Sequence, residues 1–278
     1  MGFVLGGGGS LGAVQVGMLE ALTEQKLLPD HVTGTSVGSL NGAVIAHNPY
    51  GAANPVIPCL GTHHSQPGFP RGLLAQARTL QRSRKHLFPN TGLAAVIANF
   101  LGSTTTFADL ALPFAAVTMD VAIALPHVID EGPLLPALLA SAAIPGIFPS
   151  VEHDGRRLYH GGVVANVPLR QALARGARSL VVLDCTFPGQ LLPPPESLAE
   201  TVLFTAMVTV RSQAILEATL VADTVPVVYL PGPAAHRISP FEFDATALLI
   251  EDAYEAGRSF LEELQVDGPG LYGSPLGR

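Results

Sequence analysis

The sequence has no tryptophan, only two cysteines and few charged residues. Asp, Glu, Lys and Arg make up 13% of its 278 residues, against about a quarter in an average soluble domain. Hydrophobic residues make up 48%, and this balance excludes a disordered or fibrous chain. A chain with so large a core does not need the one disulfide that Cys59 and Cys185 could form, so we expect free, buried thiols.

No hydrophobic run is long enough for a transmembrane helix. The longest apolar windows are Leu110–Leu125, which Pro113 and Asp120 interrupt, and Leu134–Pro149, which also contains prolines. A spanning helix needs about 20 predominantly apolar residues. The first residues also lack the basic region and cleavage site of a signal peptide, so we expect a cytoplasmic protein.

Long basic runs and clusters of metal ligands are missing as well. The formal net charge is −7, which argues against a nucleic-acid partner and against strong attraction to an anionic bilayer. We therefore expect at most a transient contact with a membrane surface. Cys, Asp and Glu do not gather at ligand spacing around His63 and His64, so we expect no metal ion.

The first fifty residues alternate between strand and helix patterns. Phe3–Leu5 and His31–Gly34 are short apolar or β-branched segments that predict strands. Gly12–Gln25 and Val37–His47 have the apolar spacing of helices. Such alternation, with a tight turn after each strand, predicts a parallel sheet covered by helices.

The rest of the chain continues this pattern after a proline- and glycine-rich excursion at residues 48–71. We expect a single domain over residues 1–266 and a flexible tail over 267–278. Further strands are predicted at Phe114–Met119, Ala122–Val128, Arg157–Tyr159, Leu180–Leu183 and Val225–Leu230. Further helices are predicted at Leu73–Leu87, Leu134–Ser141, Leu169–Arg175, Glu196–Val221 and Asp244–Leu264, the last with Leu248, Leu249, Phe260, Leu261 and Leu264 facing the core.

The turn after the first strand, Gly6–Gly12, is a glycine-rich loop. Consecutive glycines allow positive φ angles and turn several N–H groups toward one point at a helix N-terminus, where an anion binds. Gly7, Gly9 and Gly12 match the dinucleotide fingerprint G-x-G-x-x-G, but the end of the second strand lacks the acidic residue that the fingerprint requires. A dinucleotide-binding oxidoreductase is therefore the less favoured alternative.

The turn after the second strand is Gly34-Thr35-Ser36-Val37-Gly38, a G-x-S-x-G sequence. Between a strand and a helix, this pattern holds a serine on a strained turn, with glycines where a Cβ would clash. We expect Ser36 to be a nucleophile and Gly34 and Gly38 to form its elbow.

The two loops together predict acyl transfer. Loops that follow neighbouring parallel strands meet at one edge of the sheet. There Ser36 would attack a carbonyl carbon, and the N–H groups of Gly7, Gly8 and Gly9 would form the oxyanion hole for the developing charge. This chemistry requires no cofactor, because backbone dipoles stabilise the oxyanion.

The order of these motifs resembles the patatin-like phospholipase family. Gly7–Gly12 resembles its G-G-G-x-x-G oxyanion motif and Gly34–Gly38 its nucleophile elbow, and Ala140–Pro149 and Gly161–Pro168 are similar to two later blocks. The resemblance covers about residues 3–185. It implies a three-layer α/β/α sandwich with a mostly parallel central sheet, and a Ser–Asp dyad that hydrolyses acyl esters of lipids.

The family's dyad aspartate opens an Asp-Gly-Gly or Asp-Gly-Ala motif, and here His160 stands at that position, before Gly161 and Gly162. A neutral imidazole can accept a proton near neutral pH. His160 is thus the candidate base of an esterase that acts on a lipid or a small ester. Two alternatives stay open: a silent lipid- or acyl-binding protein, and a base elsewhere in the chain.

Other polar residues are weaker candidates. Asp120 and Asp184 each end a predicted strand and could orient His160. Asp154 belongs to an Asp-Gly sequence that predicts a hairpin turn. Asn166 is expected to form a turn or a cap rather than to contact substrate.

Overall fold

The computed structural model describes residues 1–49, 86–185, 194–233 and 244–275. The predicted excursion at 48–71 and the predicted helix Leu73–Leu87 lie outside these residues, except at their ends. The nine strands of the described residues form one sheet, in the order β5-β6-β3-β2-β1-β7-β8-β9, with β4 paired to β3. Their bounds are β1 Gly2–Leu5, β2 His31–Thr35, β3 Phe114–Asp120, β4 Leu125–Ile129, β5 Val151–His153, β6 Arg156–His160, β7 Leu180–Leu183, β8 Pro226–Tyr229 and β9 Gly270–Tyr272.

The sheet is mostly parallel, as the alternation of strands and helices predicted. All neighbours from β3 through β2, β1, β7 and β8 to β9 are parallel. β4 and β6 pair with β3 in the antiparallel sense, and β5 and β6 form a hairpin. The hairpin turn consists of Asp154 and Gly155, at φ 47° and 72°, which confirms the predicted Asp-Gly turn.

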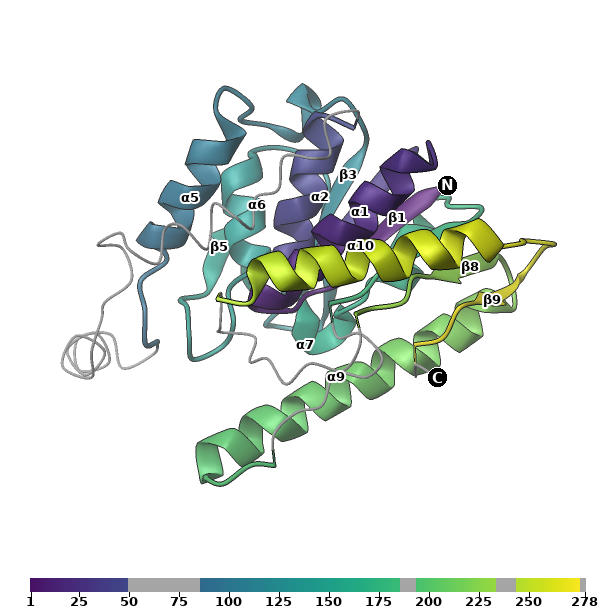
Figure 1. The fold of residues 1–278 in the computed structure, drawn as a ribbon. Helices are drawn as coiled ribbons and strands as arrows, with labels where there is room; N and C mark the ends of the chain where they lie inside the picture. Colours follow the sequence, from purple (N-terminus) through teal and green to yellow (C-terminus); the bar gives the residue numbers. More distant parts are fainter. Residues whose placement is uncertain (50–85, 186–193, 234–243, 276–278) are drawn as a thin grey trace.

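Helices cover both faces of the sheet (Figure 1). Successive side chains of a strand point to opposite faces, and accordingly Phe3 and Leu5 join one hydrophobic cluster while Val4 joins a second. The first cluster includes side chains of α1 Ala13–Glu24, α2 Val37–His47, α5 Thr91–Leu101, α6 Leu134–Ser141 and α10 Thr246–Glu263. The second includes α8 Leu169–Ala174 and α9 Leu198–Ala222, and the short α7 Gly162–Ala165 packs against α9.

The structure differs from the sequence-based expectations in several elements, among them β5 and α7, which were not predicted. The expected flexible tail from residue 267 contains β9, which pairs with β8 at the edge of the sheet. α5 was not predicted, and its apolar residues pack on α2 and α6. Leu248 of α10 is exposed rather than buried, because the buried face of this helix runs through Leu249, Ala253 and Gly257.

Among the described residues, no helix combines the length and the apolar character needed to cross a bilayer. The long helix α9 is apolar over much of its length, but it is interrupted by threonines and charged residues.

Close packing of α1 against α10 depends on a glycine. A Cβ on Gly17 would lie less than 3.0 Å from the Ile250 carbonyl oxygen and the Tyr254 nitrogen, which are backbone atoms that cannot rotate away. On the other side of the same contact, a Cβ on Gly257 would meet the Ala21 Cβ at 3.3 Å and the Met18 Cα at 3.9 Å. The two glycines therefore differ in what a methyl group would displace.

We predict that Gly17→Ala lowers the free energy of unfolding by about 1–3 kcal/mol, because overpacking outweighs the better helix propensity of alanine. Gly257→Ala is the matched control in the same helix pair, and we expect it to change stability by less than about 1 kcal/mol. Urea denaturation of the three proteins measures both values. Equal stability of the two variants would contradict the assignment of the contact to Gly17.

Candidate active site

The register of β3 brings the predicted nucleophile and base to one place. Thr35, the last residue of β2, pairs with Val117, and His160, the last residue of β6, pairs with the next residue, Thr118. β4 pairs with both Val117 and Thr118, so β2 and β6 follow one another along the other side of β3. Ser36 comes directly after β2 and therefore lies between the end of β2 and the end of β6, along the same side of β3.

Ser36 lies on a strained turn, with φ 57° and ψ −125°. Such angles cost on the order of 1–3 kcal/mol for a residue that has a Cβ. Hydrogen bonds hold the turn: the Ser36 N–H donates to Ser141 Oγ at 2.8 Å, and Ser141 donates to the Val117 carbonyl at 2.7 Å. The Ser36 carbonyl accepts hydrogen bonds from the N–H groups of Ser39 and Leu40, and these bonds form the first turn of α2.

The two glycines of the elbow are required by close backbone contacts. A Cβ on Gly34 would lie less than 3.0 Å from the Gly38 carbonyl oxygen. A Cβ on Gly38 would come equally close to the carbonyl oxygens of Leu5 and Gly6. The Gly38 contact joins the nucleophile turn to the start of the glycine loop.

The three glycines predicted to form the oxyanion hole differ in their hydrogen bonds. The Gly7 N–H donates to the Asn166 carbonyl at 3.1 Å, and Asn166 Nδ2 donates back to the Gly7 carbonyl at 3.1 Å. Gly7 lies beside Ser36, since a Cβ on it would be 3.2 Å from Ser36 Cβ. Within the described part of the chain, the N–H groups of Gly8 and Gly9 have no protein acceptor, and both residues reach the surface.

Two buried amide side chains tie the glycine loop to the helices behind it. Gln15 Nε2 donates to the carbonyls of Gly6 and Leu183, at 2.8 and 3.0 Å. Asn41 Nδ2 donates to Gln15 Oε1 at 2.7 Å and to the Gly12 carbonyl at 3.2 Å. The sequence analysis missed both residues; their signal is an amide within an otherwise small and apolar helical segment.

Ser141 and Asn166 also exceed what the sequence predicted. Ser141 was seen only as part of a motif, and Asn166 only as a turn or cap residue, yet each is hydrogen-bonded to a residue more than a hundred positions away at the centre of the site. No local pattern indicates such partners.

His160 is half-buried at the end of β6, with its N–H donating to the Ala143 carbonyl at 3.0 Å. A Cβ on Gly162 would lie less than 3.0 Å from both His160 Nδ1 and Asn166 Oδ1, so the imidazole and the amide share a small space that a glycine leaves open. Among the described residues, the His160 ring nitrogens and Ser36 Oγ have no hydrogen-bond partner, and they are not bonded to each other.

Burial lowers the pKa of His160 from its usual 6.5 to about 4. The cause is desolvation, which penalises the charged imidazolium when water is removed. His160 is therefore neutral at pH 7 and able to accept a proton. A pKa near 4 is also close to that of an ordinary aspartate, about 3.9.

The carboxylates considered as orienting groups have other partners. Asp120 accepts a hydrogen bond from Arg156 Nη1 at 2.7 Å, and Asp184 accepts one from the Tyr229 hydroxyl. Neither carboxylate is hydrogen-bonded to His160 in the described part of the chain.

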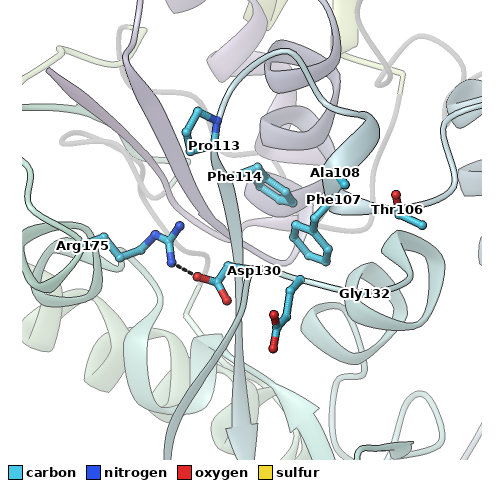
Figure 2. A pocket seen from close by; sticks show the side chains of 9 residues that line it. Thr106, Phe107, Ala108, Pro113, Phe114, Asp130, Gly132 and Arg175 are labelled. Carbon is cyan, nitrogen blue, oxygen red and sulfur yellow. Dashed lines mark hydrogen bonds and ion pairs between the residues drawn. The ribbon is translucent and has the colours of Figure 1, made fainter.

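A pocket of about 440 Å³ lies where β3 begins (Figure 2). Ser36 follows the last residue of β2, which is parallel to β3, so the pocket and Ser36 lie at opposite ends of these strands. It is lined by Thr106, Phe107, Ala108, Pro113, Phe114, Asp130, Glu131, Gly132 and Arg175. Arg175 is ion-paired with Asp130 beside it. None of the predicted site residues lines this pocket.

The described residues contain no group of three or more His, Cys, Asp or Glu side chains arranged to hold a metal ion.

Comparison with known proteins relates the chain to one family. The family model "Patatin-like phospholipase" matches residues 3–173. The mouse patatin-like phospholipase domain-containing protein 7 is 30% identical over 186 residues, which are 65% of this chain and 13% of that protein. The lysophospholipase NTE1 of Mycosarcoma maydis is 30% identical over 189 residues, 66% of this chain and 10% of that protein. The chain thus spans about an eighth or less of the length of these curated relatives.

A solved structure supports the fold. The crystal structure of VipD from Legionella pneumophila aligns with a TM-score of 0.50 and 15% sequence identity, covering 94% of this chain and 66% of that chain. At this identity the likeness concerns the fold alone, and it agrees with the mostly parallel sheet between two layers of helices.

We predict that His160 makes the protein less stable in acid. The unfolded chain binds a proton at His160 near pH 6.5 and the folded chain only near pH 4, so the free energy of unfolding falls as the pH drops from 6.5 to 4. The contribution is at most about 3 kcal/mol. Urea denaturation at pH 7 and pH 4.5 should show a smaller loss for His160→Gln than for the wild type. Identical losses in the two proteins would refute the low pKa.

Proposed function

The chain belongs to the patatin-like phospholipase family, and from this we infer that it is a serine acyl-ester hydrolase acting on a lipid or a small ester. The observation that carries the proposal is the turn of Ser36, which has a strained backbone, a fixed N–H and a neighbouring glycine loop. Strain of this kind persists only where surrounding contacts impose it, and it is typical of catalytic serines between a strand and a helix.

In the proposed reaction, Ser36 Oγ attacks the carbonyl carbon of the ester and gives its proton to His160. The carbonyl oxygen becomes an oxyanion and accepts hydrogen bonds from the N–H groups of Gly8 and Gly9. The bond from carbon to the alcohol oxygen then breaks, and the alcohol leaves with the proton. Water hydrolyses the acyl-serine ester and releases the acid.

Gly7 and Asn166 have a positioning role in this proposal. Their reciprocal hydrogen bonds engage the Gly7 N–H, so this amide fixes the loop, while the amides of Gly8 and Gly9 have no acceptor among the described residues. The chemistry calls for no metal or cofactor, because the backbone supplies the stabilising dipoles.

His160 is proposed as the base because it is neutral at pH 7 and lies one register position beyond the end of β2. Catalytic hydrogen bonds are often long in a free enzyme. We expect a bound substrate, which excludes water from the site, to shorten the distance between Ser36 Oγ and the nearer ring nitrogen of His160. The names of the relatives, phospholipases and lysophospholipases, favour a lipid acyl ester as substrate.

A second candidate function is a silent protein that binds lipids or acyl groups. Two observations favour it: a histidine replaces the family's dyad aspartate, and Ser36 and His160 are not hydrogen-bonded within the described residues. Such a protein would keep the glycine loop and the apolar surroundings of Ser36 and would turn over little ester.

We predict that a fluorophosphonate probe labels the wild-type protein and not Ser36→Ala, because only an activated serine reacts with it. Ser212→Ala, which removes an exposed serine of α9, is the matched control and should label like the wild type. In-gel fluorescence after labelling reports all three. A wild-type protein that stays unlabelled would favour the silent acyl-binding protein.

We predict that His160→Ala lowers kcat/KM for p-nitrophenyl butyrate by about 100-fold or more, the usual contribution of a general base. The wild-type value should rise through about pH 4 and stay level from pH 6 to 8, since the imidazole must be neutral. His127→Ala is the matched control, because His127 pairs with the same Thr118 from β4. His160→Asp, which restores the family's carboxylate, should exceed His160→Ala. Full activity of His160→Ala would exclude His160 as the base.

A further inference from the structure

An apolar turn projects from the edge of the sheet that carries Ser36. The turn between β3 and β4 includes Val121 and Ile123, and Leu125 is the first residue of β4; Ile123 and Leu125 are 58% and 56% exposed. It is well ordered, because the Ala122 N–H donates to Asp120 Oδ1 and the Val121 N–H to the Arg157 carbonyl, both at 2.9 Å. The protein thus holds an apolar turn, which contains no charged residue, in an ordered conformation that is exposed to water.

The first half of α9 is a second apolar projection. α9 has 25 residues and is about 37 Å long, whereas β7 and β8 on either side of it have four residues each and span about 13 Å. Its buried residues, Ala214, Glu217, Ala218, Val221 and Ala222, all lie in its last third. Leu198 and Val202, near its start, are 83% and 63% exposed, and Figure 1 shows this end extending away from the sheet.

Chain direction assigns both projections to the edge of Ser36. β3 is parallel to β2, so the turn after β3 lies at the same edge as the turn after β2. α9 ends just before the start of β8, at the amino ends of the parallel strands. The helix therefore runs along the sheet, and its first half extends beyond the carboxyl ends of the strands, where Ser36 lies. Between the two projections lies α7, which packs against both β4 and α9 and exposes Val163.

The charges around these projections exclude a strongly anionic partner. The described acidic and basic groups at the base of the β3–β4 turn include two arginines, and each is paired with a carboxylate: Arg156 with Asp120 and Arg157 with Glu152. The other ionisable groups there are Asp154, His127 and His153. The first half of α9, residues 198–210, adds the negative charge of Glu200, and the positive charge of Arg211 follows directly after it. Because the described residues around both projections have no surplus of positive charge, the complementary partner is an apolar surface whose headgroups carry no net charge.

We propose that the β3–β4 turn and the first half of α9 dock on the surface of zwitterionic phospholipid aggregates and hold Ser36 against that surface. The inference rests on the proposed function, since an acyl ester buried in such an aggregate must reach the site from the same side. Insertion of apolar side chains between headgroups supplies the affinity, which scales with the apolar area buried. The protein then acts on aggregated lipid in preference to a dissolved ester.

Binding is tested in a Ser36→Ala background, so that no turnover is required. Ile123→Glu and Val202→Glu should each weaken binding to phosphatidylcholine vesicles by about tenfold or more, measured by flotation. The matched controls are Leu220→Glu, 56% exposed near the other end of α9, and Val266→Glu, an exposed residue before β9, both at the opposite edge. These controls should bind like the parent protein, and anionic lipid should not tighten the binding of any of them.

Activity supplies the second measurement. With Ser36 present, Ile123→Glu and Val202→Glu should hydrolyse vesicle lipid about tenfold more slowly and p-nitrophenyl butyrate at the wild-type rate. A parent protein that does not bind vesicles, or variants that bind as it does, would overturn the docking surface. A change of oligomeric state on light scattering, with vesicle binding unchanged, would assign the surface to a second copy of the chain. Loss of ester hydrolysis in every protein, with vesicle binding as expected, would refute only the proposed function.

Discussion

The contact between Gly38 and the end of β1 is the constraint on which the candidate site depends. The first turn of α2 lies so close to the Leu5 and Gly6 carbonyls that a Cβ would not fit between them. This contact fixes the glycine loop against the Ser36 turn through backbone atoms alone, without side chains that could change rotamer. The spacing between Ser36 and the glycine loop is therefore fixed by backbone contacts at the end of the sheet.

Buried hydrogen bonds convert this spacing into a defined orientation. Ser141 holds the Ser36 N–H, Asn166 holds both polar groups of Gly7, and the Gln15–Asn41 pair holds two carbonyls of the loop. Each of these groups lies where water does not compete, so an unpaired partner would cost about 1–3 kcal/mol. In a chain that is only 13% charged, neutral amides and hydroxyls do the positioning that ion pairs do elsewhere.

The same burial determines what kind of base His160 can be. An exposed imidazole would be partly charged near pH 6.5, but desolvation brings the pKa of His160 to about 4. Its proton affinity is then close to that of an ordinary aspartate carboxylate. The histidine differs from aspartate mainly in length, in its neutral resting state and in the two distinct nitrogens that it can use.

Sequence alone determined those features that depend on neighbours along the chain. Alternating apolar segments predicted the parallel sheet, and α2 and α6 were predicted with their observed bounds. The G-x-S-x-G pattern predicted the strand, turn and helix around Ser36, because all three are local structures. Only the tertiary structure decided the pairing of β9, the engagement of the Gly7 amide by Asn166, the low pKa of His160 and the projection of α9. The reason is physical: each of these depends on contacts between segments far apart in sequence, or on the length of one element relative to another, and no local periodicity records either quantity.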